Sequence, residues 1–162
     1  MAKEHHYQAT TTWTGNLGTG TSHYRAFSRN YEIFAPGKSS PVLGSSDPAF
    51  RGDPSRYNPE DLLVASLSAC HMLWFLHLCA QAGIVVSSYS DAAIGTMAEQ
   101  ADGGGEFTRV TLHPHAVITD PGRVAEANAL HAKAHHLCFI ARSVNFAVEH
   151  EPVTSEGSPA TS

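Results

Sequence analysis

Apolar residues cover almost the whole circumference of one long predicted helix, which begins after Asn58 and ends before Gly83. Asn58 is a favourable N-cap, Pro59 suits the first helical position, and Glu60 and Asp61 place negative charge at the positive end of the helix dipole. Gly83 is a typical stop. Because no Lys, Arg, Asp or Glu lies between Asp61 and Gly83, we expect a central helix that is buried on most of its sides.

Alternation of apolar and polar residues predicts β-strands before and after this helix. The segments with strand character are residues 7–14, 23–34, 84–98, 106–119 and 144–148. The glycine-rich stretch 102–105 predicts a hairpin between the third and fourth of them. Pro114 lies inside the fourth segment and favours an edge or a bulge there, because proline cannot donate a ladder hydrogen bond.

A second helix is predicted from Asp120-Pro121, with an apolar stripe that runs from Val124 to Leu137 at helical spacing and ends at Cys138. Strands first, then helices mixed with hairpins, indicate an α+β fold. The long polar segment 38–57 is expected to be a functional loop. We expect one domain, with ends marked by loose tails. The expected ranges are 1–6 for the first tail, 7–152 for the domain and 153–162 for the second tail.

Charge and composition exclude several classes of protein. The 162-residue chain has a net charge of −5 and only 10 Lys plus Arg, so it offers no basic surface for nucleic acid or anionic lipid. The central helix contains too many Ser, His and Cys residues for a good membrane span. The first residues lack the apolar segment of a signal peptide, so a cytoplasmic location is expected.

Cys70 lies in the middle of the central helix. A buried cysteine often serves only as a small apolar side chain. Here His71 adjoins Cys70, and His77 returns to almost the same helix face, which favours a reactive thiol. Cys79 lies on the opposite face and is expected to be structural. In a reducing compartment three cysteines are not a structural framework, and a disulfide formed there is expected to be transient and catalytic.

The segment from Asn58 to Cys70, which begins Asn-Pro-Glu and ends in a cysteine ten residues after the Glu, resembles the OsmC/Ohr family of osmotically inducible and organic-hydroperoxide-resistance proteins. The His-His-Leu-Cys sequence that ends at Cys138 and the early Trp-Thr-Gly at 13–15 match the same family, and the likeness covers about residues 8–152. It implies an OsmC-like fold with antiparallel sheets around a long central helix. It also implies an intertwined homodimer with active sites at the subunit boundary.

The resemblance implies a role for each site residue. Cys70 would be the peroxidatic cysteine and Cys138 the resolving cysteine, while Glu60 would hold an arginine beside the Cys70 thiol. Arg51, nine residues before Glu60, corresponds best to the arginine of OsmC-type members. The other candidates are Arg56 in the same loop and, at the earlier position found in Ohr-type members, Arg25 and Arg29.

The activity implied is the reduction of organic hydroperoxides to alcohols in defence against oxidative stress. Peroxide would oxidise Cys70 to a sulfenic acid, Cys138 would form a disulfide with it, and an external lipoyl- or thioredoxin-type dithiol would reduce the disulfide, with no cofactor. Phe139 follows the second cysteine where the family often has proline, and His71 stands where phenylalanine is frequent. These departures indicate a less-studied branch of the family.

The spacing between Glu60 and Cys70 makes a geometric prediction. Ten residues of continuous helix separate them by about 15 Å along the axis, which is too far for a shared hydrogen-bond network. Glu60 is therefore expected to serve Cys70 of the other subunit, as two antiparallel central helices around a two-fold axis would allow.

Two other functions fit parts of the pattern. His131 and His135 are four residues apart on the second helix, and with Cys138 they could supply nitrogen and sulfur ligands for zinc. Alternatively, a mostly apolar pocket at the dimer interface, lined by Met72, Trp74 and Phe75, could bind a fatty or aromatic ligand without turnover.

Overall fold

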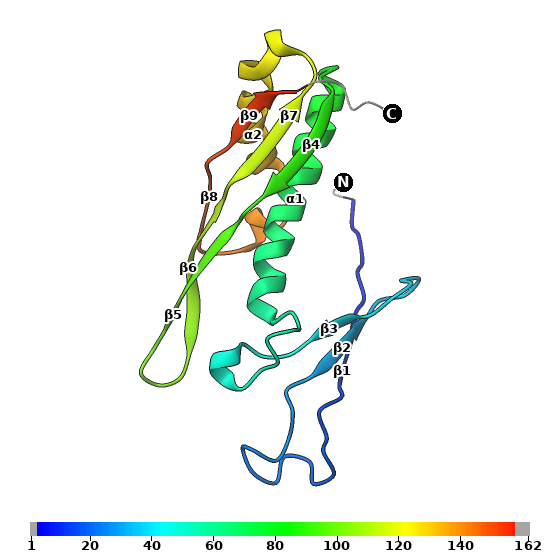
Figure 1. Cartoon of the computed structure of the whole chain (residues 1–162), viewed down its shortest axis with the longest axis vertical. Helices are drawn as coiled ribbons and strands as arrows, with labels where there is room; N and C mark the ends of the chain where they lie inside the picture. Colours follow the sequence, from blue (N-terminus) through cyan, green and yellow to red (C-terminus); the bar gives the residue numbers. More distant parts are fainter. Residues whose placement is uncertain (1–2, 158–162) are drawn as a thin grey trace. The chain divides into compact units, whose positions relative to one another are not determined.

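The structure is a computed structural model that describes residues 3–157, and the chain divides into two compact units, Met1–Leu62 and Leu63–Ser162 (Figure 1). The N-terminal unit contains one antiparallel sheet in the order β1-β2-β3. Its elements are β1 (Thr10–Trp13), β2 (Tyr31–Phe34), β3 (Val42–Gly44) and the short 3₁₀ helix η1 (Pro48–Phe50).

The strand expected over 23–34 is confirmed only at its end, in β2. Before β2 the chain forms turns, and the Arg29 guanidinium binds the carbonyl oxygens of Tyr24 and Phe27, each at 2.7 Å. The backbone carbonyls of Tyr24 and Phe27 are therefore bound by a side chain of their own segment. The expected long loop 38–57 likewise contains two short elements, β3 and η1.

Helix α1 (Pro59–Gln81) begins and ends where the sequence predicts. The Asn58 side chain accepts a hydrogen bond from the Asp61 backbone N–H at 2.7 Å, and the Asp61 carboxylate accepts one from the Asn58 N–H at 3.3 Å. This reciprocal pair is a capping box. At the other end Gly83 has a φ of +68°, a left-handed conformation that favours glycine, and the Ile84 N–H donates to the Cys79 carbonyl.

Replacing Asn58 with alanine is expected to lower the free energy of unfolding by about 1 kcal/mol, because the N–H groups of the first helical turn lose their side-chain acceptor. Denaturant unfolding of Asn58→Ala and of Asn145→Ala, an exposed asparagine outside any helix or strand, would measure this cost. An equal effect of the two substitutions would contradict the capping role of Asn58.

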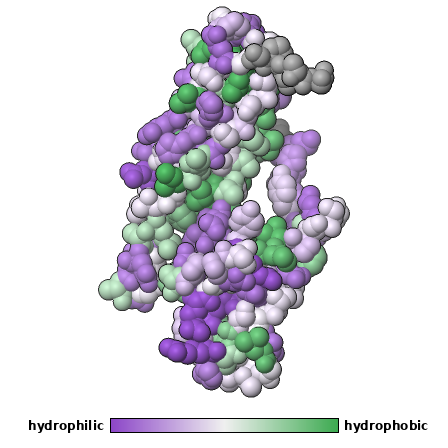
Figure 2. All heavy atoms as spheres, viewed as in Figure 1, coloured by the Kyte–Doolittle hydropathy of each residue, from purple (hydrophilic) through white to green (hydrophobic). Residues whose placement is uncertain are grey.

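Only one face of α1 is buried within a single chain. The buried residues are Leu67, His71, Phe75, Leu78 and Cys79. Leu73, on another face, is 62% exposed, although the sequence predicted burial on most sides. By length and composition alone α1 could span a membrane, but the core helix of a soluble protein meets the same criterion. Both units expose large apolar side chains, seen as green areas in Figure 2.

The C-terminal unit contains two three-stranded sheets, in the orders β4-β7-β9 and β5-β6-β8. Their strands are β4 (Val86–Asp91), β5 (Ile94–Glu99), β6 (Gly105–Leu112), β7 (Pro114–Ile118), β8 (Ala147–His150) and β9 (Val153–Glu156). The hairpin predicted around 102–105 is confirmed, because β5 and β6 pair antiparallel across it. The pairs β6/β8 and β7/β9 are parallel, so the sheets are mixed where antiparallel sheets were expected. A connection that includes a helix makes this parallel return possible.

Each long strand expected after α1 is divided into two strands that belong to different sheets. Pro114 is the first residue of β7, where its missing N–H does not interrupt a ladder. The Asp91 carboxylate accepts hydrogen bonds from the His113 backbone N–H at 2.7 Å and from the Ser68 hydroxyl at 2.5 Å. Asp91 thus joins the break between β6 and β7 to α1.

Helix α2 (Val124–Leu137) follows a short 3₁₀ helix, η2 (Pro121–Arg123), and ends at Cys138 as predicted. The Asp120 side chain makes no capping hydrogen bond. The loose tail expected from residue 153 begins instead with a strand, because β9 pairs with β7. The rest of that tail, 158–162, lies outside the described residues, as do residues 1–2 of the first tail. Packing between α1, α2 and the sheet that contains β4 and β7 forms the larger apolar core.

Candidate functional site

An apolar pocket of about 560 Å³ lies along one face of α1 in the C-terminal unit. Its lining residues are Ser66, Ala69, Cys70, Leu73, Trp74, His77, Phe139 and Ile140. Six of these recur at spacings of three and four residues, which places them on one face of a helix. The last two belong to the segment that follows Cys138. The pocket is therefore formed by the helix that carries the first candidate thiol and the segment that follows the second.

Cys70 and Cys138 differ in their surroundings. Cys70 is half-buried at the pocket wall, whereas the Cys138 side chain is 1% exposed. Burial and a contact with the Cys70 thiol raise the pKa of Cys138 to about 11. The Ala141 backbone N–H donates to the Cys138 Sγ at 3.4 Å. The two thiols are free, and they are near enough for the Cys70 thiol to raise the pKa of Cys138, which is thereby kept a neutral thiol, while Cys70 lines the pocket.

Aromatic rings form one wall of the pocket. Trp74 packs edge-to-face on Phe139, with ring centroids 5.6 Å apart and an interplanar angle of 82°. Trp74 also packs edge-to-face on His77, at 5.7 Å and 83°. The sequence predicted Trp74 in an apolar pocket but placed Phe75 and Met72 there too; Phe75 instead lies fully buried in the core. Phe139 was missed as a lining residue, although its position next to Cys138 was a signal.

The other residues singled out on α1 have distinct environments. His77 shares the pocket with Cys70, as its spacing predicted. Cys79 is fully buried in the core, and burial raises its pKa to about 11, which fits the structural role expected for it. His71 turns away from the pocket, is 1% exposed, and forms a hydrogen bond with His131 of α2 at 2.9 Å.

The residues proposed for zinc do not form a metal site. Among residues 3–157, no group of three or more His, Cys, Asp or Glu side chains is arranged to hold a metal ion. His131 binds His71 and stacks on Phe75, and His135 stacks on His150 at 5.1 Å, whereas the Cys138 Sγ accepts a hydrogen bond from the Ala141 N–H. Helical spacing placed the two imidazoles on one face correctly, but each pairs with a side chain distant in the sequence.

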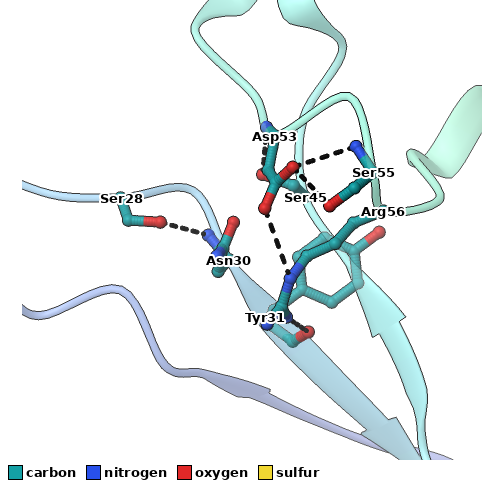
Figure 3. A network of polar contacts seen from close by, with 7 residues as sticks. All are labelled: Ser28, Asn30, Tyr31, Ser45, Asp53, Ser55 and Arg56. Atoms are coloured by element: carbon teal, nitrogen blue, oxygen red, sulfur yellow. Dashed lines mark hydrogen bonds and ion pairs between the residues drawn. The ribbon is translucent and has the colours of Figure 1, made fainter.

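Glu60 and the candidate arginines belong to the N-terminal unit. Figure 3 shows Arg56 in a polar network, where it contacts the Asp53 carboxylate at 3.8 Å and the Tyr31 carbonyl at 3.5 Å. Arg29 is bound by two carbonyls and packs over the Tyr24 and Phe27 rings.

Arg51 is exposed, has a φ of +66°, and places its guanidinium 5.9 Å from the centroid of the Tyr24 ring. Glu60 lies near Tyr31. Burial, and then the negative charges of Glu60 and Asp61, raise the pKa of the Tyr31 hydroxyl. Of the four arginines considered, Arg29 and Arg56 have guanidinium groups bound by oxygen atoms of their own unit.

Comparison with known proteins places this chain in one family. The family model described as OsmC-like protein matches residues 52–152. An OsmC-like protein of unknown function from Vibrio cholerae is similar in structure, with a TM-score of 0.82 and 31% identity over 93% of this chain and 100% of that chain.

Organic hydroperoxide resistance proteins share the fold at lower identity. The protein from Elizabethkingia anophelis has a TM-score of 0.67 and 18% identity over 97% of this chain and 100% of that chain. The protein OhrB from Bacillus subtilis has a TM-score of 0.60 and 20% identity over 91% of this chain and 98% of that chain. No curated protein matches the sequence. The family match over residues 52–152, together with the likeness to the Vibrio cholerae protein, shows that the chain belongs to the OsmC-like protein family.

Proposed function

We propose that the protein is a cysteine-based peroxidase that reduces organic hydroperoxides to alcohols in defence against oxidative stress. One observation carries the proposal: a half-buried thiol, Cys70, lines an apolar pocket near a second thiol, Cys138, which is buried and whose pKa the Cys70 thiol raises. The hydroperoxide resistance proteins that share the fold support it. The difference in exposure between the two thiols supports Cys70 for the first step and Cys138 for the second.

The reaction balances over two steps. The Cys70 thiolate attacks the outer oxygen of the hydroperoxide, the O–O bond breaks, Cys70 becomes a sulfenic acid, and the alkoxide takes a proton to become an alcohol. The Cys138 sulfur then attacks the Cys70 sulfur; a disulfide forms and the hydroxyl leaves as water with the Cys138 proton. Because the pKa of Cys138 is about 11, this thiol remains protonated at neutral pH and does not compete for peroxide.

An external dithiol completes the cycle by reducing the disulfide through two thiol exchanges, so the proposed reaction needs no bound cofactor. A dithiol of the lipoyl or thioredoxin type would serve. The buried position of Cys138 indicates that the dithiol attacks Cys70, which faces the pocket.

Glu60 and Arg51 would act on the alkoxide that leaves in the first step. A guanidinium can bind both peroxide oxygens as the bond stretches, and Glu60 would orient it. Helix α1 is continuous from Pro59 to Gln81, so Glu60 lies about 15 Å along the axis from Cys70 of its own chain. We therefore place the Glu60–Arg51 pair of one subunit at the Cys70 of a second copy, in a homodimer. The exposed Leu73 on α1 is consistent with cover by another chain.

The direct test is consumption of cumene hydroperoxide, tert-butyl hydroperoxide and hydrogen peroxide with dithiothreitol as reductant. The proposal predicts turnover of the two organic substrates and slower turnover of hydrogen peroxide, because the pocket gains binding energy only from an apolar group. Saturable binding of 2-phenyl-2-propanol without consumption of any hydroperoxide would instead support the alternative of a ligand-binding protein.

Phe139→Ala is expected to lower the rate constant of the first step with cumene hydroperoxide about tenfold, because an aromatic wall of the pocket is lost, and to leave that with hydrogen peroxide unchanged. Stopped-flow measurement of Cys70 oxidation in a single turnover separates this step from disulfide formation. The matched control is Ile94→Ala, which removes a similarly exposed apolar side chain outside the pocket. Equal slowing with both peroxides would contradict a role of Phe139 in substrate selection.

A further inference from the structure

Four imidazoles from three elements of the C-terminal unit form a cluster that the proposed reaction does not use. They are His71 on α1, His131 and His135 on α2, and His150 on β8. The His71 and His131 rings stack with centroids 5.2 Å apart and an interplanar angle of 7°. The His150 ring lies 5.6 Å from that of His71 and 5.1 Å from that of His135. The cluster thus links both long helices to one sheet.

The centre of the cluster is one hydrogen bond. The Nε2 atom of His71 and the Nδ1 atom of His131 are 2.9 Å apart, and the two side chains are 1% and 0% exposed. A neutral imidazole has one donor and one acceptor nitrogen, so this bond uses the donor of one ring and the acceptor of the other. The outer nitrogens, Nδ1 of His71 and Nε2 of His131, are buried, and no residue between 3 and 157 forms a hydrogen bond with either of them.

The surroundings of the pair favour neutral rings. On one side the Phe75 ring stacks on His131 at 3.9 Å, and Tyr89 of β4 contacts Phe75 in turn. On the other side lie the rings of His150 and His135. Burial, and then the nearby imidazoles, lower the pKa of His71 to about 4 and that of His131 to about 3.

Carboxylates near this region are bound elsewhere. Glu149, on β8, accepts a hydrogen bond from Thr111 at 3.4 Å, and Glu151 lies 3.6 Å from the His113 ring. Asp91 of β4 is bound by Ser68 and the His113 backbone. A proton taken up by the closed pair would therefore place a positive charge among apolar rings and other imidazoles, which is unfavourable.

The position of the pair relates it to the two thiols. His71 directly follows Cys70 on α1, and His131 lies on α2, the helix that ends at Cys138. The hydrogen bond therefore joins the two cysteine-bearing helices across their buried faces. Opening of the bond would admit water to the rings and would let α2 carry Cys138 away from Cys70.

We propose that His71 and His131 are a positioning pair whose hydrogen bond holds Cys138 against Cys70, and that proton uptake by this pair in mild acid separates the two thiols. This inference rests on the proposed function, because the His71–His131 pair would regulate the second step of the proposed reaction. At neutral pH the pair is closed and the disulfide forms quickly. In mild acid the pair opens, the disulfide forms slowly, and the sulfenic acid on Cys70 becomes open to further oxidation.

The test uses 4,4′-dithiodipyridine, so it needs no peroxide. With one equivalent of the reagent, Cys70 forms a mixed disulfide and releases one thiopyridone; Cys138 then displaces the second as the Cys70–Cys138 disulfide closes. The rate of the second release is measured from pH 7.5 to pH 5 in the wild type and in His71→Gln/His131→Asn. One amide can donate through its nitrogen and the other can accept through its oxygen at the places of the two bonded imidazole nitrogens, and neither amide titrates.

The Cys138 thiolate fraction falls equally with pH in both proteins, so the ratio of their rates isolates the imidazole pair. We expect the wild type to match the variant at pH 7.5 and to be about tenfold slower at pH 5. His136→Gln, an exposed histidine on the same helix, is expected to behave as the wild type does. A ratio that stays constant over this pH range would overturn the proposal.

A second readout remains if the double variant does not fold. NMR can follow the chemical shifts of the carbon-bound imidazole protons of wild-type His71 and His131 as the two rings take up protons. We expect these shifts to change over the pH range in which the second release slows by more than the falling Cys138 thiolate fraction explains. Titration of these rings with no such slowing would overturn the proposal. If the protein consumes no hydroperoxide but the pair controls disulfide closure, the proposed function fails and the positioning role stands.

Discussion

Cys70→Ser is expected to abolish hydroperoxide consumption, to the rate of a reaction without protein. Serine cannot replace the thiolate, because a hydroxyl is not ionised at neutral pH and attacks an O–O bond poorly, and Cys138 is 1% exposed and remains a neutral thiol. Peroxide assays with dithiothreitol in excess measure the loss. Cys79→Ala is the matched control, since Cys79 lies in the core and its removal should leave turnover in place.

Cys138→Ser separates the two steps of the same cycle. This variant is expected to consume one equivalent of cumene hydroperoxide at the wild-type rate and then to stall or over-oxidise, because the Cys70 sulfenic acid has lost its partner. Steady turnover by Cys138→Ser with dithiothreitol as the only added thiol would show that the external reductant reaches the Cys70 sulfenic acid directly. Residual steady activity in Cys70→Ser would contradict the assignment of Cys70 as the nucleophile.

Acid is expected to destabilise the fold through the buried imidazole pair. The pKa values of His71 and His131 are lowered to about 4 and about 3, below the value of about 6.5 for an unfolded histidine. The unfolded chain therefore binds protons at a higher pH than the folded chain. The contribution of the pair is complete above pH 6.5 and is lost as the pH falls from 6.5 toward 4.

Between pH 7.5 and pH 5.5 the free energy of unfolding should fall by about 3 kcal/mol on account of this pair. Denaturant unfolding at the two pH values measures the loss. In His71→Gln/His131→Asn the two amides do not titrate, so the loss should be smaller by this amount. The same pH dependence in the wild type and the double variant would show that the pair is not the source.

Local rules predicted the central helix well. The cap of α1 depends on Asn58 and Asp61, three residues apart, and its end depends on the left-handed conformation of Gly83, so both signals lie in short stretches of sequence. The places of Cys70, on the central helix, and of Cys138, at the end of the second, were predicted in the same way, whereas their pairing followed only from the family resemblance.

Contacts between distant residues account for what the sequence did not predict. The His71–His131 bond joins side chains 60 residues apart on two helices, and helical spacing by itself only made His131 a candidate zinc ligand. Strand β9 forms because β7 offers it a free edge, a fact that no local pattern in 153–162 reveals. The division of the expected strands near Pro114 depends likewise on Asp91, which is bound to the His113 N–H from another strand.

The exposed apolar face of α1 illustrates a different limit. The sequence pattern records that Leu73 and its neighbours are apolar, but not which chain covers them. Within one chain Leu73 remains 62% exposed and lines the pocket, which fits the proposed homodimer and the proposed substrate equally well.

The most direct test of the central claim is peptide mapping by mass spectrometry after one equivalent of cumene hydroperoxide is added to the reduced protein without dithiol. The account predicts one disulfide, between Cys70 and Cys138, with Cys79 still a free thiol and one equivalent of 2-phenyl-2-propanol released. Three free thiols with the hydroperoxide intact, or a disulfide that includes Cys79, would contradict it.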